Sequence, residues 1–180
     1  MKSFNKNIKI VLTGPESTGK STLTRLLAEK YNAPFVDEIA RDYLNSLNRK
    51  YVYNDLVEIA KMQILAEKNL ENKNSPIVFL DTDLIVTKIW FLHCYGKFPS
   101  FVDKHLKNNK NVYHLLCYYD LPWEPDPLRE NPDIRDVLFE KYRFEIEKYS
   151  YPYGIVKGIG INREENALKI IQKYFLENNI

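Results

Sequence analysis

A run of residues near the amino terminus carries the clearest chemistry. Residues 14–21 read GPESTGKS, which matches the pattern G-x-x-x-x-G-K-[ST] of a phosphate-binding loop. In such a loop the glycines let the backbone wrap around a phosphate, and the backbone N–H groups supply positive potential. Lys20 is expected to reach the β and γ phosphates, and Ser21 to hold Mg²⁺. The alternative is a glycine-containing turn that merely begins a helix.

Three carboxylates stand where strands of a parallel sheet are expected to end. Asp81 follows an apolar run, residues 77–80, as does the acid that holds Mg²⁺ in phosphate-loop proteins. Asp83 lies two residues further on and either serves the acceptor or only caps the next helix. Glu38 ends a short predicted strand, where it is placed to take a proton from an acceptor hydroxyl. The alternative for Glu38 is an exposed acid at a helix start.

Three arginines are candidates for binding the acceptor or the transferred phosphate. Arg41 lies one helical turn after Glu38 and is expected to pair with it or to hold an acceptor group. Arg129 and Arg135 flank a helix start in a proline-rich segment, about residues 120–136, whose length is typical of a mobile lid. There they are expected to neutralise phosphate charge, as an in-chain arginine finger does. The alternative is a pair of surface arginines that balance nearby acids.

The elements that must position these residues alternate between strand and helix. Hydrophobic patterning predicts strands over residues 8–13, 34–38, 77–80, 112–119 and 154–159. Helices are predicted over residues 20–31, 39–47, 101–106 and 132–149, the last with Asn131 as its N-cap. Three more are predicted: one capped by Asn54, one that ends near Tyr95 and one that opens at Asn162. The alternation predicts an α/β fold, a five-stranded parallel sheet with helices on both faces. Ligands of such sheets bind at the carboxyl ends of the strands.

Composition and charge exclude several classes of protein. The 180 residues suit one domain, and 44% hydrophobic with 28% charged residues is typical of a globular chain. A net charge of +2, with no basic patch, argues against nucleic acid as a partner. The first apolar run is too short for a signal peptide or a membrane span. Cys94 and Cys117 are expected to be buried thiols in a reducing compartment, so a cytoplasmic protein is expected.

Missing motifs narrow the class of nucleotide-binding protein. A regulatory GTPase carries Asn-Lys-x-Asp after its fourth strand, and a transporter ATPase carries Leu-Ser-Gly-Gly; the sequence contains neither. A small-molecule kinase that uses ATP and Mg²⁺ is therefore favoured, as a single domain over residues 1–180 with its lid at about residues 120–136. One alternative is a kinase for another nucleoside or small metabolite. The other is an ATP-binding regulatory module whose hydrolysis drives a partner.

Several motifs, taken together and in order, resemble the ribosylnicotinamide kinase domain of NadR-type proteins. They are residues 14–23, 38–44, 81–84, 121–123 and 128–135. Glu16 within the phosphate loop and the Asp-Thr-Asp sequence at residues 81–83 are the more discriminating pieces. The resemblance covers almost the whole chain.

The resemblance implies ATP-dependent phosphorylation of the ribose 5′-hydroxyl of nicotinamide riboside, which gives nicotinamide mononucleotide, on a P-loop, nucleoside-monophosphate-kinase-like fold. It also implies that Trp90 offers an aromatic face to the nicotinamide ring; the alternative for Trp90 is a core tryptophan. Relatives often carry a helix-turn-helix and an adenylyltransferase domain ahead of the kinase. Neither precedes the first strand here, so repression and the final NAD-forming step are not expected.

The expected site residues fall into four groups. Nucleotide binding is expected of Gly14, Glu16, Ser17, Thr18, Gly19, Lys20, Ser21, Thr22 and Arg129. Catalysis is expected of Lys20, Glu38, Asp81, Arg129 and Arg135. Acceptor binding is expected of Glu38, Arg41, Tyr43, Asp83 and Trp90. Magnesium binding is expected of Ser21 and Asp81.

Overall fold

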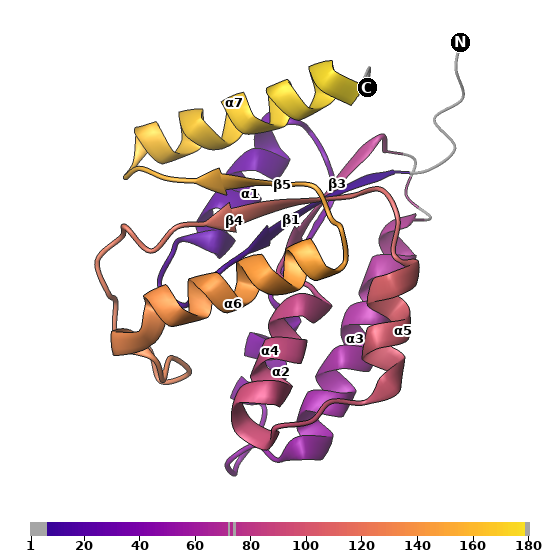
Figure 1. Cartoon of the computed structure of the whole chain (residues 1–180), viewed down its shortest axis with the longest axis vertical. Coiled ribbons are helices and arrows are strands. Elements are labelled where there is room, and N and C mark those ends of the chain that lie inside the picture. The colour runs from indigo at the N-terminus through magenta and orange to yellow at the C-terminus, as the bar shows by residue number, and fades with distance from the viewer. Residues whose placement is uncertain (1–6, 72, 74, 179–180) are drawn as a thin grey trace.

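A parallel sheet runs through the middle of the molecule (Figure 1). The computed structural model describes residues 7–71, 73 and 75–178. Within them the sheet has five strands in the order β2-β3-β1-β4-β5. The strands are β1 (Ile8–Thr13), β2 (Phe35–Val36), β3 (Ile77–Asp81), β4 (Val112–Cys117) and β5 (Tyr153–Val156). The predicted α/β fold with a five-stranded parallel sheet is confirmed.

Helices cover both faces of the sheet. They are α1 (Lys20–Lys30), α2 (Ile39–Asn45), α3 (Tyr53–Glu71), α4 (Leu84–Tyr95), α5 (Ser100–Asn108), α6 (Arg135–Lys148) and α7 (Ile161–Asn178). Helices α1 and α7 pack on one face, and α3, α4, α5 and α6 contribute to the core on the other (Figure 1). A short 3₁₀ turn, Pro132–Ile134, precedes α6.

The central strands are buried on both faces, which explains their nearly continuous apolar sequences. In β1, Ile10 and Leu12 join the core beneath α1 and α7, while Val11 between them joins a cluster on the other side. In β4, Leu115 and Leu116 divide in the same way. Successive side chains of a strand point to opposite faces, so both layers draw on the same strands.

Three predicted strands end earlier than expected. The fourth ends at Cys117 rather than at residue 119. The second covers only residues 35–36 of the predicted 34–38, and Glu38 instead precedes α2 as its N-cap. The fifth ends at Val156 rather than at residue 159. Gly158 and Gly160 follow it with φ of 102° and 55°, and this left-handed backbone turns the chain away from the sheet.

Several helix starts also differ from the predictions. Asn54 and Asn162 lie inside α3 and α7, each one residue past the start, so neither is the predicted N-cap. Helix α5 begins at Ser100 with Pro99 as its N-cap. The predicted start of α6 at Pro132 is the 3₁₀ turn, and the α-helix begins at Arg135.

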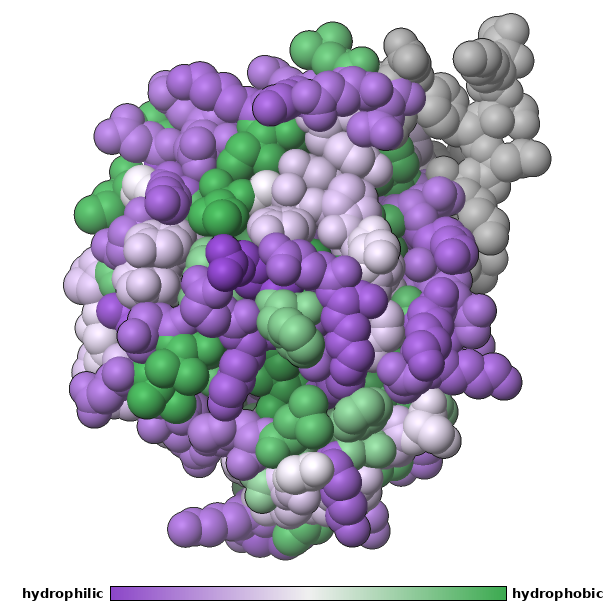
Figure 2. Space-filling view, viewed as in Figure 1, coloured by the Kyte–Doolittle hydropathy of each residue, from purple (hydrophilic) through white to green (hydrophobic). Residues whose placement is uncertain are grey.

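The surface is mixed in character. Figure 2 shows a mainly hydrophilic face on which the hydrophobic residues form separate patches. Among the described residues, no helix combines the length and the apolar character needed to cross a membrane. Cys117 is buried, whereas Cys94 is exposed, so the expectation that both thiols are buried is wrong for Cys94.

Candidate active site

The phosphate loop connects β1 to α1 at the carboxyl end of the sheet. Gly14 has φ of 133°, and a Cβ atom at this position would lie 2.7 Å from the backbone oxygen of Cys117. Gly19 has φ of 72° and precedes α1 without a side-chain cap, so the first N–H groups of that helix point towards the loop. Both glycines are therefore required by the backbone. The loop offers the N–H groups that an anion needs.

The side chains of Lys20 and Thr18 both donate hydrogen bonds to one carbonyl of this loop. The Lys20 ammonium donates a hydrogen bond to the Pro15 carbonyl at 2.7 Å, and the Thr18 hydroxyl donates to the same oxygen at 2.8 Å. The charged end of Lys20 therefore lies over the loop. Both Lys20 and Ser21 line the adjoining cavity. This is the arrangement in which a lysine can exchange a carbonyl for a phosphate oxygen.

Asp81, the last residue of β3, is a buried carboxylate without a hydrogen-bond partner. It is 1% exposed, and neither oxygen finds a partner among the described residues. Burial raises the pKa of Asp81, while the nearby Ser21 hydroxyl and Lys20 ammonium oppose that rise. Mg²⁺ prefers oxygen ligands, and an unpaired carboxylate beside a serine hydroxyl supplies them. Phosphate oxygens and water molecules would complete the coordination shell of the ion. The residues present therefore fit a magnesium ion.

The lid, the segment of residues 120–136, rests on the phosphate loop through Glu16. The Glu16 carboxylate accepts hydrogen bonds from the backbone N–H groups of Glu130 at 3.2 Å and Asn131 at 3.0 Å. The Ser17 hydroxyl accepts another from the N–H of Glu124 at 2.8 Å. Two side chains of the loop thus hold the lid, in addition to any role they have toward a nucleotide.

Arg129 and Arg135 both lie where the lid meets the phosphate loop, but their guanidinium groups have different partners. Arg129 lines the cavity and lies 3.3 Å from the Ser17 hydroxyl. Arg135 donates to the carbonyl of Leu121 at 2.8 Å and stacks over the Trp123 ring at 5.9 Å. Arg135 is not among the residues that line the cavity. In this structure the Arg135 guanidinium also lies 3.4 Å from the Ser17 carbonyl of the phosphate loop, and its predicted catalytic role stays a prediction.

Across the cavity, Glu38 and Arg41 form the start of the acceptor side. Glu38 lines the cavity, and its carboxylate lies 3.4 Å from the Arg41 guanidinium. Arg41 also donates to the Asp126 carboxylate of the lid at 2.8 Å. Hydrogen bonds from the Leu128 N–H and from Arg41 lower the pKa of Asp126, which keeps this pair charged. Arg41 therefore joins the acceptor side to the lid.

An aromatic wall, formed by Tyr51 and Trp90, lines the same side. The Trp90 indole N–H donates to the Tyr51 hydroxyl at 3.1 Å, and the ring centroids lie 4.9 Å apart at 73°. Both residues line the cavity. Trp90 is half-buried: it packs against the core cluster on this face of the sheet and also lines the cavity. Tyr51 was missed by sequence reasoning, because it lies in an irregular segment with no motif around it.

Two predicted acceptor residues point elsewhere. Asp83 is 1% exposed; one oxygen accepts from the Ile85 N–H at 3.0 Å as the cap of α4, and the other lies 2.9 Å from His114. The Tyr43 hydroxyl donates to Asp55 at 3.0 Å. Neither Asp83 nor Tyr43 is among the residues lining the cavity. For Asp83 the helix-cap alternative holds, since both of its oxygens are used inside the fold.

One cavity of about 1210 Å³ joins the phosphate loop, Arg129, Glu38 and the aromatic wall, whereas buried Asp81 is not among its lining residues. The phosphate loop follows the central strand β1, so it lies between Glu38, which follows β2 at one edge of the sheet, and exposed Ile159 and Ile161, which follow β5 at the other edge. Arg163 closes that end: its guanidinium donates to Asp120 at 2.7 Å and to the Thr18 carbonyl at 2.9 Å. No motif marks Arg163, because its partners lie far away in sequence.

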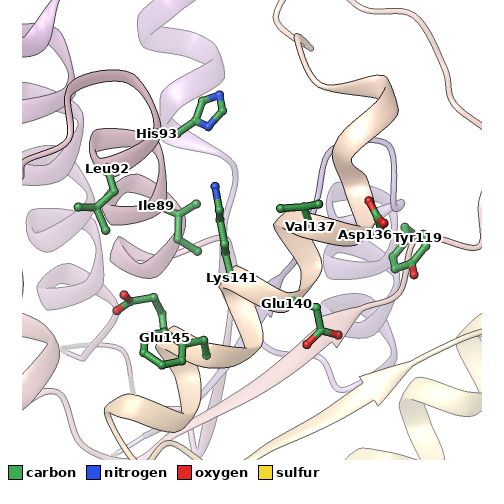
Figure 3. Close-up of a pocket in the computed structure, with 10 residues that line it drawn as sticks. Ile89, Leu92, His93, Tyr119, Asp136, Val137, Glu140, Lys141 and Glu145 are labelled. Atoms are coloured by element: carbon green, nitrogen blue, oxygen red, sulfur yellow. The ribbon is translucent and has the colours of Figure 1, made fainter.

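A second cavity, of about 770 Å³, lies between α4 and α6 (Figure 3). Ile89 and Leu92 of α4 face Val137 of α6, and Lys141 extends from α6 towards α4. Ile89 and His93 line both cavities, so α4 is a wall that the two share. The second cavity holds none of the predicted site residues.

The amino-acid sequence of this chain is similar to a protein family and to curated proteins. A family model described as an AAA domain matches residues 9–163. A curated relative, the trifunctional NAD biosynthesis/regulator protein NadR of Salmonella typhimurium, is 27% identical over 124 residues. That match covers 67% of this chain and 30% of the relative, so the chain spans less than a third of that protein.

Solved structures show the same fold at low sequence identity. A NadR protein in complex with NR has a TM-score of 0.77 and 23% identity, covering 93% of this chain and 49% of that chain. The complex of NadR with NAD and AMP-PNP has a TM-score of 0.72 and 22% identity, with the same coverage. Deoxyadenosine kinase from M. mycoides has a TM-score of 0.61 and 17% identity, covering 96% and 100%. The resemblance to a NadR-type P-loop kinase domain is confirmed.

Proposed function

The chain belongs to the AAA domain family, and from that premise we propose that it is an ATP-dependent kinase of nicotinamide riboside. The product is nicotinamide mononucleotide, formed by phosphorylation of the ribose 5′-hydroxyl. One observation carries the proposal. A single cavity contains Lys20 of the phosphate loop, Glu38 opposite it and the aromatic ring of Trp90. A phosphate donor and a flat-ringed acceptor can therefore meet in one space.

On the donor side, the loop N–H groups, Lys20 and Arg129 bind the phosphates of ATP. Ser21 and Asp81 hold Mg²⁺, which when bound neutralises phosphate charge. The exposed apolar residues after β5, Ile159 and Ile161, offer a surface to the adenine base. These residues position the γ-phosphate and stabilise its charge, which is most of what phosphoryl transfer asks of a protein.

On the acceptor side, Glu38 takes the proton of the 5′-hydroxyl. The hydroxyl oxygen then bonds to the γ-phosphorus while the bond between that phosphorus and the leaving ADP oxygen breaks. Lys20 and Arg129 face the charge that develops on the transferred group. The lid, at about residues 120–136 of a single kinase domain, excludes water and so favours transfer over hydrolysis.

A kinase for another nucleoside is the second candidate. The M. mycoides deoxyadenosine kinase structure is matched over 100% of its length, whereas the NadR structure is matched over 49%. The match to a nucleoside kinase therefore supports a nucleoside other than nicotinamide riboside as the acceptor. The two candidates share the donor side and the base Glu38, and they differ only in the ring that the aromatic wall receives.

The test measures ADP release from ATP and Mg²⁺ with nicotinamide riboside, thymidine, adenosine or uridine, beside a reaction without acceptor. We expect nicotinamide riboside to stimulate ADP release most, with nicotinamide mononucleotide as the product. Stimulation by another nucleoside alone would replace this acceptor with the second candidate. Equal rates in every reaction would overturn the kinase proposal and favour an ATPase that acts through a protein partner.

A further inference from the structure

We propose that Glu130 is a specificity-determining residue that selects an acceptor with a positively charged ring. The lid brings its carboxylate to the aromatic wall of Tyr51 and Trp90. The inference rests on the proposed function, because nicotinamide riboside carries its charge on the pyridinium ring. It goes beyond that function by naming what distinguishes this acceptor from neutral nucleosides.

The contact between lid and wall runs through one hydroxyl. Tyr51 donates to the Glu130 carboxylate at 3.4 Å and accepts from the Trp90 indole at 3.1 Å. Burial raises the pKa of the Tyr51 hydroxyl, so it stays a donor at neutral pH. Glu130 therefore places a negative charge at the hydroxyl edge of the Tyr51 ring, next to the Tyr51–Trp90 pair. A cationic ring is attracted both by aromatic faces and by a carboxylate.

Glu130 also contacts the donor side. Its backbone N–H donates to the Glu16 carboxylate of the phosphate loop at 3.2 Å, while its side chain reaches the aromatic wall. The same residue thus touches both halves of the cavity. When the lid closes over a nucleotide, the backbone bond to Glu16 carries the Glu130 carboxylate to the acceptor.

The charge of Glu130 is not neutralised within the fold. Across the described parts of the chain, its carboxylate forms no ion pair, whereas Arg41 pairs with Glu38 and Asp126, and Arg49 pairs with Asp55. Lys50 also lines the cavity and is exposed, as Glu130 is, so solvent screens both charges, but only Glu130 contacts the aromatic wall. A positive ring at the wall therefore meets an available carboxylate.

A neutral ring gains only stacking from the same wall. The contrast can be isolated with one substitution, because Glu130→Gln removes the charge and keeps an acceptor oxygen for Tyr51. The matched control is Asp133→Asn, an exposed carboxylate of the same lid that does not line the cavity. Both variants lose one negative charge from the lid, so only position separates them.

The first measurement is kcat/KM for nicotinamide riboside and for its neutral 1,4-dihydro form. For Glu130→Gln we expect about a tenfold fall with the cationic acceptor, equal to about 1.4 kcal/mol, and less than about a twofold change with the neutral one. Asp133→Asn should change neither. Equal falls with both acceptors, or no fall with the cation, would overturn the inference.

The second measurement does not depend on turnover. Calorimetry with AMP-PNP present compares the Kd of 1-methylnicotinamide, a pyridinium cation, with that of neutral nicotinamide. We expect wild type to prefer the cation and Glu130→Gln to lose that preference, while thermal melting shows both proteins folded. If the preference depends on Glu130 but nicotinamide riboside is not phosphorylated, the proposed acceptor fails and the inference stands. If wild type shows no preference, the inference fails.

Discussion

The two sides of the cavity are built in different ways. The donor side is a continuous stretch of backbone, residues 14–21, whose shape depends on glycines at positions with positive φ. The acceptor side consists of side chains from separate elements, with Glu38 before α2, Tyr51 between helices and Trp90 on α4. Backbone can bind any phosphate, whereas a set of side chains selects one acceptor. The difference separates what is general in this protein from what is specific.

The lid is where the two sides meet. Glu16 of the phosphate loop binds lid backbone, and Arg41 on the acceptor side binds the Asp126 carboxylate of the lid. Both halves of the cavity therefore contact the segment of residues 120–136. In the proposed kinase, this arrangement would enclose the γ-phosphate when the donor and acceptor sides are held together.

The largest effect is expected for Lys20→Ala, which tests the donor side. The variant removes the positive charge that faces the transferred phosphate. We expect turnover to fall about a thousandfold or more, because that charge acts on the transition state in a site shielded from water. Thermal melting should remain close to wild type, since among the described residues the hydrogen bond of the Lys20 ammonium goes to the loop carbonyl of Pro15. The control is Lys61→Ala, an exposed lysine of α3. Full activity in Lys20→Ala would reject the donor-side assignment.

Glu38→Gln alters the acceptor side and leaves the phosphate loop unchanged, so it separates the roles of the two sides. The variant keeps the shape of the side chain and removes the proton acceptor, so we expect turnover to fall about a hundredfold. The Kd of ATP should stay within about twofold, because the loop is untouched. Single-turnover kinetics and calorimetry separate these quantities, and Glu29→Gln on the exposed face of α1 is the control. An unchanged rate would move the base to Asp81.

Asp83→Ala is expected to reduce stability and to have little effect on activity at either side of the cavity. It removes the cap of α4 and the partner of His114, which should cost about 2 kcal/mol of the free energy of unfolding. The kcat/KM for the acceptor should change less than about threefold. Chemical denaturation and steady-state kinetics measure the two effects. A large rise in the acceptor KM with unchanged stability would return Asp83 to the acceptor side.

Local sequence predicted the elements that local interactions decide. The strand–loop–helix unit around residues 14–21 and the place of Asp81 at the end of β3 both follow from short apolar runs and their neighbours. Helix starts were less predictable. Asn54 and Asn162 have the chemistry of an N-cap, yet each lies one residue inside its helix. Tertiary packing outweighs a preference of about 1 kcal/mol.

Contacts between residues far apart in the chain could not be predicted from the sequence. Trp90 and Tyr51 are 39 positions apart, Arg41 and Asp126 are 85 apart, and Arg163 and Thr18 are 145 apart. For the same reason, the sequence did not indicate that Tyr43 would bond to Asp55, or that Asp83 would lie against His114. A residue type indicates which bonds a side chain can make, but not which partner reaches it.

By itself, then, the amino-acid sequence determined the phosphate loop, the alternation of strands and helices, and the parallel sheet that follows from them. These depend on backbone conformations and apolar spacing within a few residues. Only the tertiary structure decided the strand order, the contact of the segment of residues 120–136 with Glu16, and the wall of Tyr51 and Trp90. Those features come from side chains that meet only after the chain has folded, and their partners are set by the packing of whole elements.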